Sequence, residues 1–118
     1  MKAVIISKNG GPEVLELKDI KLNDPNSGEV LIKNEAIGLN YIDTYHRSGL
    51  YPLKLPIGLG LEGSGIITEV GSNVKNLKAG DKVAYAAIPL GSYSTHRNFP
   101  ASKLCLYTHL TLPTSDLV

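Results

Sequence analysis

Residues 40–51 concentrate polar and aromatic side chains of the kinds that bind small molecules. These twelve positions include one amide, three phenols, a carboxylate, a hydroxyl, an imidazole and a guanidinium, on Asn40, Tyr41, Asp43, Thr44, Tyr45, His46, Arg47 and Tyr51. Amides and phenols orient a carbonyl or an aromatic ring without carrying a full charge, and binding residues favour loops that a rigid scaffold holds. The residue types leave two interpretations open: a binding site, or a cap whose hydroxyls face water.

A second candidate is the glycine-rich segment "GLGLEGSG" at residues 58–65, which contains the pattern G-x-G-x-x-G. In a dinucleotide site this pattern follows a strand and opens a helix whose N-terminus faces the pyrophosphate. Residues 66–70 are instead rich in β-branched side chains, which indicates a strand. Asp81 has nearly the spacing of a ribose-binding acid, but the surrounding "AGDK" is typical of a turn. We therefore predict that these glycines let strands bend and approach closely.

Histidine and cysteine are too sparse to indicate a metal centre or a nucleophile. The three histidines are His46, His96 and His109, and the single cysteine is Cys105. No pair of them has the spacing of metal ligands. The serines near these histidines do not stand in a nucleophile elbow, and Cys105 has no evident base beside it. We predict no metal site and an inert thiol.

The elements that must position these residues are mostly short strands. We expect strands over residues 1–6, 13–20, 29–38, 66–70, 83–87 and 91–100. Clusters of Gly, Pro and Asn between them indicate antiparallel pairing rather than βαβ units. Residues 40–49 interrupt the pattern as a short helix, with Asn40 as its N-cap and Gly49 at its C-terminal end. The pattern predicts a mainly β fold, a barrel or sandwich with short helices.

Composition limits the classes of function. With 118 residues, of which 42% are hydrophobic and 19% charged, the chain is long enough for one globular domain. Its formal net charge of +1 indicates neither a nucleic-acid surface nor a membrane surface. No apolar run reaches the roughly 20 residues of a membrane span, and no signal peptide is recognisable. The single cysteine favours a reducing compartment, so we expect a cytoplasmic protein.

Four stretches of the chain form a characteristic set: "GGPEVL" (10–15), "AIGLNYIDTYHRSGLYP" (36–52), "LPIGLGLEGSGIITEVGSNV" (55–74) and "AGDKVAY" (79–85). Together they resemble the catalytic domain of the medium-chain dehydrogenase/reductase superfamily, and within it the zinc-free quinone oxidoreductases of the zeta-crystallin type. The resemblance runs from Met1 to about Leu104. It implies a GroES-like, partly open β-barrel over residues 1–104.

The resemblance also implies what the chain lacks. In this family a Rossmann domain follows the barrel and holds the cofactor phosphates, and we expect this chain to be without that domain. We therefore expect a truncated enzyme that binds NADPH weakly and is inactive alone. Residues 105–118 do not continue as the family does. We interpret them as an atypical tail that arose from a frameshift or an artefact, with an extra edge strand as the alternative.

The same resemblance implies chemistry without zinc. Zinc-dependent members of the superfamily carry a cysteine at the position of Asn40 and a histidine at that of Leu61. This chain has neither ligand, and a leucine side chain cannot bind a metal. Glu62 would then be structural, with its carboxylate paired to an arginine or to backbone amides.

Site residues follow from the resemblance position by position. By this resemblance we expect the catalytic residues to be Asn40, Tyr45 and Tyr51. We expect the cofactor-binding residues to be Asn40, Tyr41, Ile42, Asp43 and Tyr45. With NADPH as the hydride donor, the catalytic residues would orient a quinone or an electron-poor alkene and hydrogen-bond its oxygen.

The expected partners are few: the small-molecule substrate, the missing Rossmann domain, and a second copy in a homodimer of the full-length protein. We expect no nucleic acid and no membrane. A face left uncovered by the missing domain would favour self-association. A different interpretation stays open, in which the chain is a stand-alone GroES-like module for binding or assembly, without catalysis.

Overall fold

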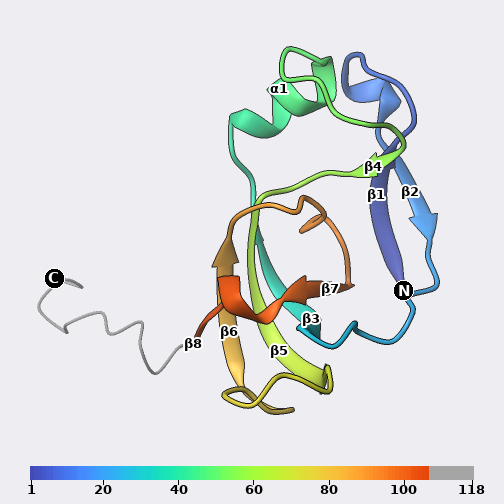
Figure 1. The fold of residues 1–118 in the computed structure, drawn as a ribbon. Coiled ribbons are helices and arrows are strands. Elements are labelled where there is room, and N and C mark those ends of the chain that lie inside the picture. The colour runs from blue at the N-terminus through green and yellow to red at the C-terminus, as the bar shows by residue number, and fades with distance from the viewer. Residues whose placement is uncertain (107–118) are drawn as a thin grey trace, which may run out of the picture.

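The computed structural model describes residues 1–106, which form two antiparallel sheets (Figure 1). The smaller sheet has the order β2-β1-β4, with β1 at Lys2–Ile6, β2 at Glu16–Asp19 and β4 at Ile57–Gly58. The larger has the order β7-β3-β5-β6-β8, with β3 at Glu29–Gly38, β5 at Glu62–Val70, β6 at Lys82–Ala86, β7 at His96–Pro100 and β8 at Cys105–Leu106. The helical elements of the described residues are η1 at Pro12–Val14, α1 at Ile42–Ser48 and η2 at Ala101–Lys103.

The predicted mainly β fold with short helices is confirmed. The larger sheet runs from β7 to β8 without closing on itself, so the barrel is partly open. Cys105 and Leu106, which begin the predicted tail, pair with β6 as an edge strand. The rest of that tail, residues 107–118, lies outside the described residues. No helix in the described part of the chain is long and apolar enough to cross a membrane.

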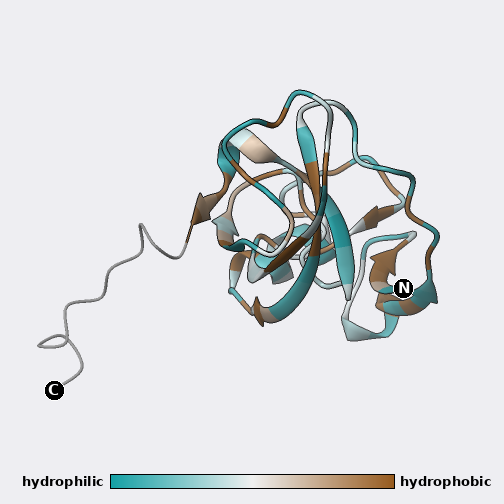
Figure 2. Ribbon diagram, turned by 90° about the horizontal axis from the view of Figure 1, so that it is seen from below, coloured by the Kyte–Doolittle hydropathy of each residue, from teal (hydrophilic) through white to brown (hydrophobic). Residues whose placement is uncertain are grey.

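Buried apolar side chains on the strands build the core. Along β3, Val30 and Ile32 are fully buried and Lys33 is exposed. Leu31 between them is also buried, next to an irregularity in the pairing with β5, so the alternation of a strand with one face toward the core is interrupted here. The strands of Figure 2 accordingly carry both hydrophobic and hydrophilic segments. The larger core cluster consists of Val30, Ile32, Ile67, Leu77, Val83, Tyr85 and Phe99. A smaller cluster of Ile6, Val14 and Leu59 lies by the smaller sheet.

The glycine-rich segment leads into a strand, as predicted. β5 begins at Glu62, inside the glycine pattern, and the next element along the chain is the strand β6 rather than a helix. A Cβ on Gly65 would lie 2.1 Å from the carbonyl oxygen of Lys33 on the neighbouring strand. Only glycine therefore permits this approach of β3 and β5. The turn at Asp81 is confirmed as well, because its carboxylate accepts the backbone N–H of Lys78 at 3.0 Å.

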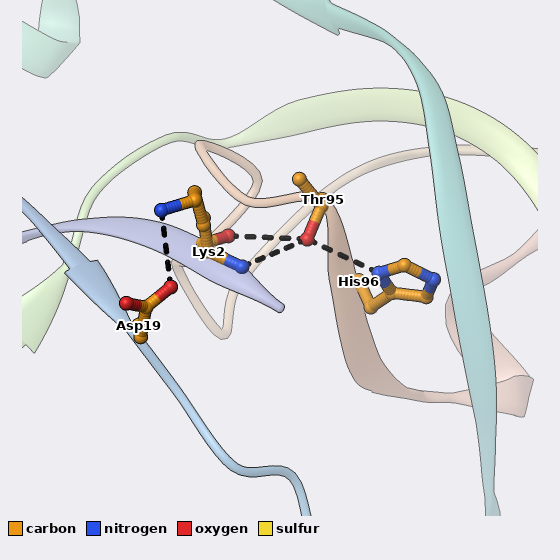
Figure 3. A network of polar contacts seen from close by, with 4 residues as sticks. All are labelled: Lys2, Asp19, Thr95 and His96. Carbon is orange, nitrogen blue, oxygen red and sulfur yellow. Dashed lines mark hydrogen bonds and ion pairs between the residues drawn. The ribbon is translucent and has the colours of Figure 1, made fainter.

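A small polar network joins the two sheets near the N-terminus (Figure 3). The backbone N–H of Lys2 on β1 donates to Oγ1 of Thr95 at 2.9 Å, and Nδ1 of His96 lies 3.1 Å from the same oxygen. The backbone N–H of Thr95 donates in return to the Lys2 carbonyl at 2.8 Å. Lys2 also pairs with Asp19 at 3.1 Å, but both side chains are exposed and such a pair adds little stability.

The helix begins one residue later than predicted. Its N-cap is Tyr41, without a side-chain capping bond, rather than Asn40. The Asn40 carbonyl already accepts the N–H of Asp43 at 3.0 Å, so the chain turns before the first helical residue. Gly49 ends the helix in the left-handed conformation with φ of 89°, as predicted.

Candidate active site

α1 lies at one end of the molecule and connects β3 to β4 (Figure 1). Three tyrosines, Tyr41, Tyr45 and Tyr51, cluster at this helix. The ring of Tyr45 lies 5.3 Å from that of Tyr41 and 5.3 Å from that of Tyr51, edge to face in both cases. This is the favourable geometry for aromatic pairs. Tyr41 is 75% exposed and Tyr51 is 49% exposed. The three rings together form a partly exposed aromatic surface.

Asn40 lies between this aromatic surface and the start of β5. Its side-chain Nδ2 donates to Oε1 of Glu62 at 2.9 Å, and its backbone N–H donates to Oδ2 of Asp43 at 3.1 Å. The expectation that Glu62 pairs with an arginine or with backbone amides was wrong, because its partner is the side-chain amide of Asn40. Both arginines of the chain bond elsewhere: Arg47 donates to the Gly10 carbonyl at 3.2 Å, and Arg97 to the Pro89 carbonyl at 2.8 Å.

The buried side chain of Asp43 holds the start of α1 in place through hydrogen bonds. It is 3% exposed, and its Oδ2 accepts a hydrogen bond from the Tyr93 hydroxyl as well as from the N–H of Asn40. Burial raises the pKa of the Tyr93 hydroxyl, and the bond to the Asp43 carboxylate raises this pKa further. The neighbouring Ile42 is partly buried. Of the expected cofactor-binding residues, therefore, Asp43 turns its side chain inward and Tyr41 turns its ring to solvent.

The histidines and the cysteine belong to different elements. His46 is buried on α1, His96 lies on β7 and Cys105 on β8, while His109 lies outside the described residues. Within residues 1–106, no three side chains of His, Cys, Asp or Glu form a group that could hold a metal ion. Burial lowers the pKa of His96, and the nearby Lys33 and N-terminal charges lower it further.

A hollow of about 520 Å³ borders Glu62 on the larger sheet. Its polar lining includes Tyr85, Lys103 and Cys105, but neither Asn40 nor the three tyrosines line it. The candidate site is therefore the exposed surface around Asn40 rather than this hollow.

Family comparison agrees with this architecture. A family model described as the alcohol dehydrogenase GroES-like domain matches residues 26–110. The chain belongs to this family. Over 100 residues the GroES-like domain is 52% identical to quinone oxidoreductase 1 of Escherichia coli, a match that covers 84% of this chain and 31% of that protein.

Two further similarities extend the comparison. Over 106 residues the domain is 41% identical to a 2-haloacrylate reductase of a Burkholderia species, which covers 86% of this chain and 32% of that protein. The crystal structure of Escherichia coli quinone oxidoreductase complexed with NADPH matches with a TM-score of 0.88 and 46% identity, over 98% of this chain and 34% of that one. The chain spans about a third of the length of the curated relatives it matches.

The residues of the GroES-like domain fit one end of a nicotinamide cofactor. The exposed rings of Tyr41 and Tyr51 would offer flat apolar faces to a nicotinamide ring. Phosphates do not fit here. α1 has only seven residues, and the Asp43 carboxylate lies at its N-terminal end, where it would repel an anion. The described residues thus suit the nicotinamide and not the phosphates.

Tyr93 was missed by the sequence reasoning. It lies 50 residues from Asp43 along the chain, and nothing in its local sequence distinguishes it from a core tyrosine. Glu62 was singled out, but its partner Asn40 is 22 residues away, between β3 and α1. Neither pairing has a local signal, because each depends on how the strands pair in space.

Proposed function

We propose that this chain is the substrate-side domain of an NADPH-dependent quinone oxidoreductase that also accepts electron-poor alkenes. The observation that carries the proposal is the cluster of the Tyr41, Tyr45 and Tyr51 rings on the segment that directly follows Asn40, whose amide is held by Glu62. Sequence similarity to a quinone oxidoreductase and to a 2-haloacrylate reductase supports the same substrate classes.

The chain's own residues would position the hydride acceptor, which is the quinone or the alkene. When bound, NADPH supplies the hydride, and a proton from water completes the reduced product. An N–H of Asn40 and the hydroxyls of Tyr45 and Tyr51 would donate hydrogen bonds to the acceptor oxygen, on which negative charge develops. The exposed ring of Tyr41 would pack against the flat nicotinamide and help to exclude water from it.

We propose that this chemistry needs no metal. A conjugated quinone or enone already spreads the charge that the hydride brings, so the hydrogen bonds of Asn40 and the phenols would stabilise it sufficiently. Leu61 precedes Glu62 with a side chain that cannot bind a metal. The Asn40 amide directs its nitrogen toward Glu62.

The test is a chimera in which this chain replaces the matching 100 residues of Escherichia coli quinone oxidoreductase 1. NADPH oxidation by benzoquinone is followed by absorbance. We expect reduction that a chelator does not inhibit, and a kcat about a hundredfold lower in Asn40→Ala, as for the loss of an oxyanion donor. The matched control is Asn76→Ala at an exposed position, which should behave as the parent chimera does.

Two results would count against the proposal. A folded chimera that binds NADPH but reduces neither benzoquinone nor a haloacrylate would favour a binding or assembly module without catalysis. Inhibition by the chelator, with recovery on adding zinc, would contradict the metal-free mechanism.

A further inference from the structure

The strand pair that ends two residues before Asn40 places a glycine opposite a glutamate. Gly38, at the end of β3, pairs directly with Glu62, at the start of β5. A Cβ on Gly38 would lie 1.9 Å from Oε1 of Glu62 and 2.3 Å from both its Cγ and its Cδ. The glutamate side chain therefore lies across the backbone of β3, in space that any residue other than glycine would occupy.

This path brings the Glu62 carboxylate to the side chain of Asn40. An ionised carboxylate accepts hydrogen bonds and donates none, whereas the two ends of an amide differ, since nitrogen donates and oxygen accepts. Glu62 can therefore face only the nitrogen of Asn40. The flipped amide, with Oδ1 toward Glu62, would bring two acceptors together. One orientation is selected, and it leaves Oδ1 and the second N–H of Asn40 for other partners.

The backbone of Asn40 is held at the same time. Its N–H donates to the buried carboxylate of Asp43 at 3.1 Å, while its side chain donates to Glu62 at 2.9 Å. One carboxylate lies on α1 and the other on β5, so Asn40 is fixed between a helix and a strand. Within the described residues, the hydroxyls of Tyr41, Tyr45 and Tyr51 make no comparable bonds.

We propose that Glu62 is a positioning residue, which sets the direction of the Asn40 amide. In this direction the second N–H of Asn40 meets the oxygen of the quinone or enone substrate. Gly38 provides the space that the Glu62 side chain occupies. This inference rests on the role of Asn40 in the proposed function. It revises the expectation that Glu62 is only structural. Glu62 acts through Asn40 and need not touch the substrate.

The first test measures the amide itself, without turnover. In ¹⁵N-labelled chain, the side-chain N–H signals of Asn40 are assigned by their loss in Asn40→Ala. Glu62→Gln keeps the size but can donate as well as accept, so the amide loses its selected orientation. Gly38→Ala keeps the glutamate but displaces its carboxylate. We expect both variants to shift the Asn40 signals and to speed their exchange with water about tenfold, which corresponds to one hydrogen bond to a charged group.

Matched controls separate this effect from general loosening of the fold. Glu69→Gln changes an exposed glutamate on the same strand, and Gly28→Ala adds a Cβ with nothing within 4 Å. Both should leave the Asn40 signals in place. Unchanged Asn40 signals in both Glu62→Gln and Gly38→Ala would overturn the inference, whatever the chimera does.

The second test uses the chimera described above. Glu62→Gln and Gly38→Ala should each lower kcat about tenfold, because one transition-state hydrogen bond is misdirected, and should leave the KM for NADPH nearly unchanged. Shifted Asn40 signals with an unchanged kcat would overturn the positioning role. An inactive parent chimera would instead contradict the proposed function, while the selection of the amide orientation by Glu62 would still be decided by the first test.

Discussion

Replacing Tyr93 with phenylalanine tests whether the buried Asp43 carboxylate holds the site together. The substitution keeps the ring and removes only the hydroxyl that donates to Oδ2 of Asp43. Asp43 is 3% exposed, and its Oδ1 has no partner within the described residues. The carboxylate would then keep a single bond, from the N–H of Asn40 at 3.1 Å. Losing a hydrogen bond to a buried charged group costs about 1.5–3 kcal/mol, so we expect a loss of about 2 kcal/mol.

Urea unfolding followed by circular dichroism measures this loss of unfolding free energy as a lower urea concentration at the midpoint. The melting temperature should fall by about 8 °C. Tyr41→Phe is the matched control: Tyr41 is 75% exposed and its hydroxyl makes no bond within residues 1–106, so it should change stability by less than about 0.5 kcal/mol. If Tyr93→Phe unfolds at the same urea concentration as the parent chain, the Asp43 carboxylate does not depend on this hydroxyl and the reasoning is refuted.

Three further predictions concern the scaffold. Gly65→Ala places a Cβ 2.1 Å from a backbone carbonyl of β3 that cannot move aside, so stability should fall by more than about 3 kcal/mol, whereas Gly28→Ala should be neutral in the same urea assay. Phe99→Ala leaves a cavity at a fully buried core position and should lower the free energy of unfolding by about 3–5 kcal/mol, measured by calorimetry. Burial raises the pKa of Tyr93 and Tyr85 in the folded state, so the protonated phenols stabilise the fold below the ordinary tyrosine pKa of about 10. This contribution is lost as the pH rises further, and the urea midpoint should fall above about pH 10, less steeply in Tyr93→Phe.

The local features of the fold were predictable because they depend on neighbouring residues. The β-branched residues after the glycine segment indicated β5, and Gly49 indicated the end of α1. The start of the helix was displaced by one residue because the Asn40 carbonyl bonds to Asp43 before the helix begins. The strand expected over 91–100 shrank to His96–Pro100. In the preceding residues the backbone N–H of Tyr93 donates to Leu59, outside the larger sheet.

The candidate site, by contrast, depends on strand register, which is not a local property. Gly38 faces Glu62 only because β3 and β5 pair as they do, with irregularities after Leu31 and after Asn34. A shift of one residue would move Glu62 to the other face of the sheet, since side chains alternate along a strand, and the Asn40 amide would lose its partner. Positions 38, 40 and 62 therefore act as one unit, and a substitution at any one of them should be judged by its effect on the direction of the Asn40 amide.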